Sequence, residues 1–485
     1  MVELSQEQKA ACNYAYRHTD GRITAVEAVS GSGKSFMLKT LDSVLTGRRL
    51  YTSFAKSLVE ETKSLYPPEV EVTTFHSYCY DVVIRQGLGG GKEVLSGPRT
   101  ITTHFTYRDV TSRLEDTERE LVVKTMEQFF GSQYVSILEF IKHKEVPEEI
   151  ANLVIYYIKE MVNKKRPVTF DFIIKWFHIL LHRKMFHVEP YEAIYLDESQ
   201  DFSATGLEIF KLLPAKRKLL VGDGKQALYS SFTESINGFI HLKDDISKSF
   251  PLTRSFRVNI ADAKTVQGFM REHVDDKFQF SGHDHHDTTI RTTGYITRTN
   301  ASLIAKMLEL TDDGIEYGLV RKVGNLFSTV ITIMSLKVGK YVEGELGYLN
   351  EDITNYTKDK TINKKTTTLL KYIIKTHRTN PKLRNTFTLL MTNKFDKIWD
   401  LYYSAKKMEK SKKKCDLLLG TVFGFKGFTV DRAILSNDLN LDYIKDDKLS
   451  AEDRLTEHYI RYVSVTRHRI QLDGAEWLNK YKEIK

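Results

Sequence analysis

The chain has 485 residues, of which 41% are hydrophobic and 28% are charged. This length is too great for one small core and predicts about two to four domains, and the composition is typical of a folded protein rather than a disordered one. No apolar run is long enough for a transmembrane helix, and the N-terminus lacks the basic start and apolar centre of a signal peptide. The sequence therefore argues against a membrane protein and predicts an intracellular one.

Basic residues outnumber acidic residues by 72 to 63, which gives a net charge of +9. Such a balance favours polyanionic partners, although a basic surface without a special role fits the charge equally well. The three cysteines are widely scattered, which argues against a disulfide framework or a structural zinc site and favours a reducing compartment. We expect the cytoplasm in a bacterial or viral setting and the nucleus in a eukaryote.

A glycine-rich turn lies between the strand-like run 23–26 and the helical pattern 36–41. Strand, glycine-rich turn, Lys-Ser and helix is the order that a phosphate-binding loop requires, because small residues let backbone N–H groups close around the phosphates. Lys34 is expected to reach the β- and γ-phosphates of a nucleotide, and the Ser35 hydroxyl to ligate Mg²⁺. The predicted phosphate-binding residues are Ser30, Gly31, Ser32, Gly33, Lys34 and Ser35.

The predicted secondary structure changes twice in the first half of the chain. From about residue 4 to 80 short apolar strands alternate with helices, whereas from about 114 to 184 long helices are expected, for example over 118–130 and 150–162. The α/β pattern then returns, which indicates a helical insertion in an α/β domain. Strands are expected in this half at 50–54, 193–196 and 218–221.

A second boundary is expected between about residues 270 and 293, where the polar stretch 281–287 indicates an exposed loop. Its His and Asp residues are potential metal ligands, but compact polar loops of this kind are mostly not metal sites. The Lys- and Thr-rich stretch from about 337 to 380 is interpreted as a small helical excursion. Further strands are expected at 294–297, 417–421 and 432–435.

The strand at 193–196 is followed directly by Asp197 and Glu198. An ATP-hydrolysing site needs an acidic residue near Mg²⁺ and a base or water-positioning residue at the end of a nearby strand. Asp197 is the candidate for the Mg²⁺ shell. Glu198 is the candidate for orienting or deprotonating the attacking water.

Together with the phosphate loop, several short motifs resemble those of the UvrD/Rep-like superfamily 1 DNA helicases. The segment 197–201 resembles motif II of that family, and the other motifs occur in the family's order from Gln8 to Arg467. The segment 50–80 looks most like the F-box DNA helicase branch. No F-box-like extension is expected, since the motor motifs begin at about Leu4.

The resemblance implies roles for further residues around the nucleotide. It implies that Gln8 reads the adenine edge, that Gln226 senses the γ-phosphate and that Phe256 stacks on adenine. It also implies that Arg257 binds the γ-phosphate and that Arg467 is an arginine finger presented from the second domain. The residues expected to carry the chemistry are Lys34, Asp197, Glu198, Gln226, Arg257 and Arg467.

The same resemblance indicates a track for single-stranded nucleic acid, since the segment 73–77 is similar to the family's "TFHS" motif that touches single-stranded DNA. Such tracks combine backbone contacts with aromatic stacking. For a single aromatic residue a place in the core is the alternative, except that Phe75 and His76 lie inside the motif. The candidate contacts are Phe54, Phe75, His76, Tyr229 and Phe232.

The fold that the resemblance implies is α/β, with two RecA-like P-loop motor domains built on parallel sheets. A helical insertion is expected in the first domain and a reduced one in the second. The expected boundaries are 1–77 and 190–280 for the first motor domain, 78–189 for its helical insertion, and 281–485 for the second motor domain with a small insertion at about 337–400.

Three departures from the family pattern bear on mechanism. The aromatic residue after motif III is one place late, at Phe232, and the arginine that follows it is missing. Phe423 and Thr429 stand where the family has a histidine and an acidic residue in motif V. The stretch between Arg257 and Thr421 is short, so that translocation is expected to survive while duplex unwinding is weak or depends on a partner.

The function that the resemblance implies is an ATP- and Mg²⁺-dependent helicase or translocase, moving 3′ to 5′ on single-stranded or tailed duplex DNA in replication, repair or recombination. RNA as a substrate and protein partners stay open, and no membrane partner is expected. The alternatives are a DNA-stimulated ATPase that acts as a nucleic-acid-bound switch or complex component without unwinding, a nucleoside or small-molecule kinase, and a non-catalytic nucleic-acid-binding protein.

Overall fold

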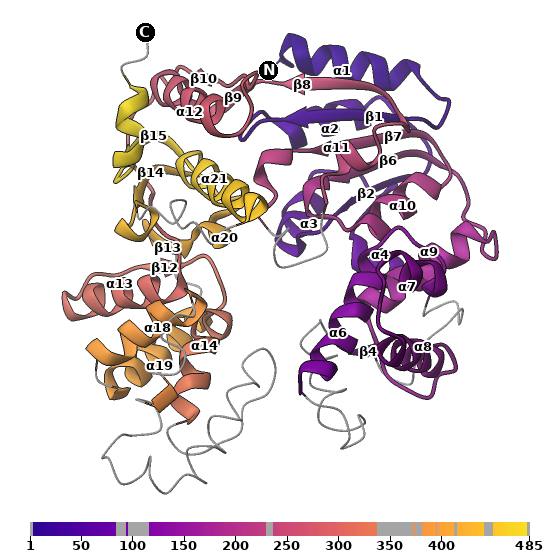
Figure 1. The fold of residues 1–485 in the computed structure, drawn as a ribbon. Coiled ribbons are helices and arrows are strands. Elements are labelled where there is room, and N and C mark those ends of the chain that lie inside the picture. Colours follow the sequence, from indigo (N-terminus) through magenta and orange to yellow (C-terminus); the bar gives the residue numbers. More distant parts are fainter. Residues whose placement is uncertain are drawn as a thin grey trace, which may run out of the picture. The chain divides into compact units, whose positions relative to one another are not determined.

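The computed structural model divides into two compact units, Met1–Ser255 and Phe256–Lys485 (Figure 1). Among the residues that the structure describes, no helix is both long and apolar enough to cross a bilayer. These residues are 3–83, 94–95, 116–228, 236–336, 372–373, 381–393, 395–411, 415–440 and 450–482.

A six-stranded sheet with strand order β3-β2-β6-β7-β1-β8 forms the centre of the first unit. Neighbouring strands pair in parallel throughout. Because all carboxyl ends of a parallel sheet meet at one edge, the segments that follow the strands are brought together there. The strands are β1 (Ile23–Ala28), β2 (Arg49–Ser53), β3 (Val70–Thr74), β6 (Tyr191–Asp197), β7 (Ala215–Gly222) and β8 (Ile246–Leu252).

Helices cover both faces of this sheet, as a parallel sheet requires. One face packs against the apolar sides of α1 and α2, and the other packs against α4, α9 and α10. The helices and 3₁₀ turns next to the sheet are α1 (Gln6–Arg17), α2 (Lys34–Asp42), α3 (Lys56–Lys63), α4 (Phe75–Val83), η2 (Ser199–Asp201), α10 (Ala204–Leu212), η3 (Gly224–Gln226) and α11 (Gly238–His241).

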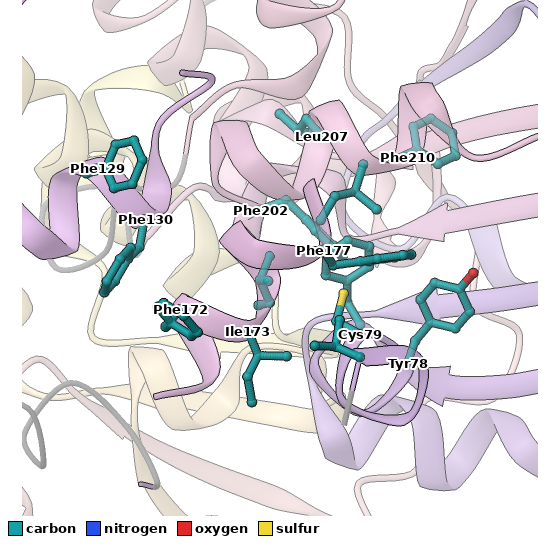
Figure 2. Close-up of a cluster of buried hydrophobic side chains, with 14 of the residues drawn as sticks. Tyr78, Cys79, Phe129, Phe130, Phe172, Ile173, Phe177, Phe202, Leu207 and Phe210 are labelled. Carbon is teal, nitrogen blue, oxygen red and sulfur yellow. The ribbon is translucent and has the colours of Figure 1, made fainter. Parts of the chain in front are cut away.

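A helical part is inserted between β3 and β6 and shares its core with the sheet (Figure 2). In this core Phe129 and Phe130 of α6 and Phe172 and Phe177 of α9 lie in one cluster with Phe202, which follows η2. The insertion is therefore packed onto the sheet domain, and its described residues share the core of that domain. Its elements are β4 (Val94–Leu95), α6 (Asp116–Gly131), α7 (Ile137–His143), α8 (Glu148–Val162), β5 (Val168–Thr169) and α9 (Phe170–His182).

The second unit contains a five-stranded parallel sheet with strand order β12-β13-β11-β14-β15. Helices α13, α14, α18 and α19 form an apolar core on one side of β13. The elements are β9 (Arg254–Asn259), α12 (Ile260–His273), β10 (Ser281–His283), β11 (Thr293–Thr297), α13 (Asn300–Asp312), β12 (Gly318–Leu319), α14 (Val323–Leu336), α18 (Pro381–Thr392), α19 (Phe395–Ser411), β13 (Leu417–Thr421), α20 (Val422–Phe425), β14 (Val430–Leu435), η5 (Asn437–Leu439), α21 (Ala451–Val465), β15 (His468–Asp473) and η7 (Glu476–Tyr481).

The predicted fold class is confirmed, because each unit is built on a parallel sheet with helices around it. One local prediction is wrong, since part of the stretch 281–287 is strand β10, which pairs with β9. Gly282 makes this possible: a Cβ at that position would lie 2.4 Å from the Asn259 carbonyl oxygen. The helical excursion predicted at 337–380 lies largely outside the described residues.

Candidate active site

The predicted phosphate-binding turn connects the end of β1 to the first residue of α2, Lys34. Gly31 and Gly33 adopt φ angles of 73° and 77°, in the left-handed region where a side chain is strained. Ser30, which precedes Gly31, and Ser32, which lies between the two glycines, are both buried. Since α2 begins at this turn, its unpaired backbone N–H groups and the positive end of its dipole are directed at the place where an anion would bind.

Gln8 is tied to this turn through its side-chain amide. Its Nε2 donates to the carbonyl oxygens of Ser32 at 2.9 Å and Gly33 at 3.4 Å, and its Oε1 accepts the Ser5 N–H at 2.9 Å. Ser5 in turn caps the helix α1 that contains Gln8. The structure thus places Gln8 against the phosphate-binding turn, and its role toward adenine stays a prediction.

Lys34 faces a group of carboxylates that comes from two neighbouring strands. Its Nζ lies 3.3 Å from Oε1 of Glu198, and both side chains are largely buried. Asp197 ends β6, while Asp223 follows β7, the strand next to it. The parallel register therefore brings both acids to the edge of the sheet where the phosphate-binding turn lies.

Burial and charge act in opposite directions on these groups. Burial alone would lower the pKa of Lys34, but Glu198, Asp197 and Asp223 raise it above its ordinary value. Burial raises the pKa of Asp197 to about 6, with the negative charge of Glu198 adding to the effect and Lys34 opposing it. Burial also raises the pKa of Asp223, again against the influence of Lys34. A buried ammonium ion is therefore held by carboxylates that are themselves costly to ionise.

Glu198 has an unusual backbone conformation, with φ 55° and ψ 46°. A non-glycine residue in the left-handed region costs of the order of 1 kcal/mol, and such strain tends to occur at functional sites. The conformation ends β6 abruptly, and the Glu198 N–H donates back to Oδ1 of Asp197 at 2.9 Å. The two adjacent carboxylates are thereby directed to different partners, Asp197 to Tyr51 and Glu198 to Lys34.

A chain of amide and carboxyl groups links the two strand ends. Gln200 Nε2 donates to Glu198 Oε2, and Gln200 Oε1 accepts the Asp223 N–H at 3.0 Å. Gln226 Nε2 donates to Oδ2 of Asp223 at 2.8 Å. Gln226, the predicted γ-phosphate sensor, is thus connected to Glu198 through Asp223 and Gln200.

The oxygen ligands available here suit Mg²⁺, which prefers hard carboxylate and hydroxyl oxygens. Asp197 is 1% exposed, and its carboxylate accepts hydrogen bonds from the Tyr51 hydroxyl at 2.7 Å and from the Glu198 N–H. Each carboxylate oxygen has two acceptor positions, so both retain capacity for the ion or its water. Ser35, in the first turn of α2, is the hydroxyl that would join it. The residues present therefore fit the ion.

The predicted aromatic contacts to nucleic acid divide into different environments. Phe54 is 37% exposed, and its ring meets that of His76 edge-on at 5.1 Å. Phe75, in contrast, is 2% exposed and packs edge-on against Phe202 at 5.1 Å. The predicted stacking of Phe75 on a base is corrected accordingly, because its ring belongs to the core. Tyr229 and Phe232 lie outside the described residues.

His76 also faces an acid of the helical insertion. Burial lowers the pKa of His76, and the charge of Asp171 opposes that shift. Burial likewise raises the pKa of Asp171, and His76 opposes it. The rings of His76 and Phe170 lie 6.0 Å apart. The first turn of α9 therefore adds an aromatic ring and an acid to the surroundings of His76.

The second unit contains the two predicted arginines and Phe256. Nη1 of Arg257 donates to the carbonyl oxygen of Thr466 at 3.3 Å, which places Arg257 beside the start of β15. Arg467 is 1% exposed, and its Nε donates to the carbonyl oxygen of Val463 at 2.9 Å. The ring of Phe256 meets that of His283 at 5.9 Å. Arg257 and Arg467 thus approach the same backbone segment, while their roles toward a nucleotide stay predictions.

Sequence reasoning missed Asp223, Gln200 and Tyr51. Asp223 carried the same signal as Asp197, an acid directly after an apolar strand, and could have been found by the same argument. Gln200 lies in the motif itself, but the sequence alone indicates no role for it. Tyr51 carried no signal, because a tyrosine within a buried strand is read as a core residue.

A parallel α/β sheet with a glycine-rich turn, a lysine and acids at its carboxyl edge has the architecture of a P-loop nucleotide-binding domain. The family model for the UvrD/REP helicase N-terminal domain matches residues 4–247, which is half of the chain. The chain therefore belongs to the UvrD/REP helicase family.

Two relatives are similar over shorter stretches. The chain is 26% identical to F-box DNA helicase 1 of Gallus gallus over 277 residues, which are 53% of this chain and 26% of that protein. It is 31% identical to the RecBCD enzyme subunit RecB of Buchnera aphidicola subsp. Acyrthosiphon pisum (strain APS) over 91 residues, which are 18% of this chain and 8% of that protein. The chain thus spans a minor part of the length of both relatives.

Proposed function

We propose that this protein is an ATP- and Mg²⁺-dependent DNA helicase or translocase that moves 3′ to 5′ on single-stranded DNA. The observation that carries the proposal is the Lys34–Glu198 pair at 3.3 Å, which joins the phosphate-binding turn to the carboxylates at the ends of β6 and β7. Family membership supports the DNA substrate and the motor activity. Replication, repair or recombination is the proposed setting.

Binding of ATP would rearrange the ion pair. The phosphate oxygens compete with Glu198 for the Lys34 ammonium, so that Lys34 turns to the β- and γ-phosphates and Glu198 is released. Glu198, still held by Gln200, then accepts a proton from the attacking water. Mg²⁺, when bound by Ser35 and Asp197, neutralises charge on the phosphates.

Two arginines are proposed to stabilise the transition state together with Lys34. The charge that spreads over the transferred phosphoryl group is stabilised by cations, and Arg is suited to this because its planar fork binds two oxygens at once. Arg257 and Arg467 fill this role in the proposal. Gln226 would sense the γ-phosphate and pass its presence to Asp223, with which it already forms a hydrogen bond.

On the nucleic-acid side, Phe54 and His76 are the proposed stacking residues. Phe54 is exposed enough to meet a base, and the adjacent His76 ring supports it from the edge. The net charge of +9 favours the phosphate backbone. Tailed duplex DNA is the proposed substrate for unwinding. RNA is the alternative substrate, and its binding and stimulation of ATP hydrolysis are to be compared with those of DNA.

The test is the Lys34→Ala variant, with Lys39→Ala as the matched control on the exposed side of α2. Removing a cation from the phosphoryl site should reduce DNA-stimulated ATP hydrolysis at least about 100-fold while single-strand binding is retained. Lys39→Ala should hydrolyse ATP like the wild type. Strand displacement with 3′- and 5′-tailed duplexes reads polarity and unwinding in the same preparation.

Three results would contradict the proposal. Undiminished ATPase in Lys34→Ala would remove the active-site assignment. Wild-type hydrolysis that is equal with and without DNA would contradict the assignment as a DNA motor. The alternative of a nucleoside or small-molecule kinase would then be favoured. DNA-stimulated hydrolysis without displacement from either tail, together with no directional movement on single strands, would favour a nucleic-acid-bound switch.

A further inference from the structure

The hydroxyl of Tyr51 reaches the carboxylate of Asp197 from the neighbouring strand. Tyr51 lies in β2 and is 0% exposed, and its hydroxyl donates to Oδ2 of Asp197 at 2.7 Å. The register pairs Tyr51 with Tyr195 and Ser53 with Asp197, so the tyrosine side chain leans along the sheet toward its carboxyl edge.

Two donors from different elements therefore fix the orientation of this carboxylate. The Glu198 N–H holds Oδ1 from the turn after β6, and Tyr51 holds Oδ2 from β2. A carboxylate held at both oxygens cannot rotate about its last torsion without losing a charge-assisted hydrogen bond. Each oxygen keeps one acceptor direction for a metal or a metal-bound water.

We propose that Tyr51 is a positioning residue that orients Asp197 for Mg²⁺, an inference that rests on the function proposed above. Partners that orient a metal-binding carboxylate typically change metal affinity by 10- to 100-fold when they are removed. Tyr51 touches neither substrate nor metal in this assignment. Its contribution is made through the hydroxyl alone, since the ring packs in the core.

Two neighbouring tyrosines provide matched controls. The ring of Tyr66 lies 5.4 Å from that of Tyr51, and its buried hydroxyl has no hydrogen-bond partner within the described part of the chain. The Tyr195 hydroxyl donates at 3.0 Å to Asp42, which also accepts from Arg49 at 2.8 Å. Removing a hydroxyl from Tyr66 or Tyr195 thus perturbs the same core without touching Asp197.

The experiment compares Tyr51→Phe with Tyr66→Phe and Tyr195→Phe in the full chain. Binding of a fluorescent, non-hydrolysable ATP analogue is titrated with Mg²⁺, and the Mg²⁺ concentration at half-maximal tightening is measured. We expect this concentration to rise about 10-fold in Tyr51→Phe and to stay within about twofold of wild type in the two controls. Melting temperatures, measured without nucleotide, report purely structural effects.

A Tyr51→Phe midpoint equal to that of Tyr66→Phe overturns the inference, as does a rise that all three variants share. The proposed function is contradicted if the wild type binds the nucleotide more tightly with Mg²⁺ but shows no DNA-stimulated hydrolysis. In that case the binding measurements still decide whether Tyr51 is a positioning residue. A wild type whose nucleotide binding is indifferent to Mg²⁺ overturns both.

Discussion

At the residue scale, the site is a buried ammonium ion among carboxylates. Lys34 meets Glu198 at 3.3 Å with Asp197 and Asp223 behind it, and each ion taken from water carries a desolvation cost of several kcal/mol. Because of this cost, such a cluster contributes little to the free energy of folding. It is well suited to a site where a polyphosphate binds the Lys34 ammonium and thereby breaks its ion pair with Glu198.

Glu198→Gln tests the role of that released carboxylate. The substitution removes the proton acceptor but keeps the size of the side chain, so ATP should still bind while hydrolysis falls by about 100- to 10,000-fold. The measurement is nucleotide affinity alongside single-turnover hydrolysis. Glu189→Gln, which changes an exposed glutamate just before β6, should retain wild-type turnover. Hydrolysis by Glu198→Gln within a few-fold of wild type would exclude Glu198 as the base.

The residues of this site could be predicted to different degrees. Lys34, Asp197 and Glu198 were accessible because each follows or precedes an apolar strand in a recognisable order. The burial of Phe75 was not, because an aromatic residue in a motif looks the same in sequence whether it faces DNA or the core. The contact of Tyr51 was not either, since it depends on which strands are neighbours.

At the element scale, periodic patterns predicted the chain well where they were long. The helices expected over 118–130 and 150–162 are α6 (Asp116–Gly131) and α8 (Glu148–Val162). The strand β10 was missed because its three residues, Ser281–His283, include no apolar side chain and pair with the short strand β9. Its formation depends on the missing side chain of Gly282, which is a tertiary effect rather than a local preference.

The end of α6 is held by a buried lysine of α9. Lys175 is 1% exposed, and its Nζ donates to the carbonyl oxygens of Ser132 and Tyr134, at 2.5 Å and 2.9 Å. These carbonyls lie just beyond the last turn of α6, where backbone oxygens need partners. Burial lowers the pKa of Lys175 to about 7, and Glu208 opposes this shift.

Lys175→Met should therefore change how stability depends on pH. Because the folded state lowers the lysine pKa, it binds fewer protons than the unfolded state between about pH 7 and pH 10, and folding stability gains with rising pH in that window. The free energy of unfolding of the wild type should increase relative to the variant by up to about 1.4 kcal/mol per pH unit. Denaturant unfolding at several pH values measures this difference.

The control for this prediction is Lys159→Met, which removes an exposed lysine of α8. Its free energy of unfolding should follow the wild type in parallel across the same pH range. A Lys175→Met variant that also runs parallel to the wild type would show that the Lys175 ammonium is not disfavoured in the folded protein.

At the scale of the whole molecule, the residues proposed to act on ATP are divided between the two units. Lys34, Asp197 and Glu198 belong to the first unit, whereas Arg257 and Arg467 belong to the second. A phosphoryl group that needs these arginines as well as Lys34 would make hydrolysis depend on residues of both units. Binding of the nucleotide by the first unit would then be separable from turnover.

Arg467→Lys tests this separation while keeping the positive charge. Lysine lacks the planar fork that binds two phosphate oxygens, and an arginine finger contributes about 10³- to 10⁵-fold to turnover. We expect nucleotide affinity within a few-fold of wild type and a turnover number lowered at least about 100-fold. The matched control is Arg469→Lys, which should leave turnover unchanged. Arg469 lies in β15, two residues after Arg467, and its side chain is half-exposed.

Arg467 is also a buried residue, so stability must be measured with activity. Its guanidinium donates to the Val463 carbonyl oxygen and to Oγ1 of Thr466, and loss of these bonds would lower the melting temperature. A variant that melts like the wild type and binds nucleotide but does not turn over supports the arginine finger. A variant that melts like the wild type and hydrolyses ATP at the wild-type rate rules it out, and the transition-state charge would then fall to Lys34 and Arg257.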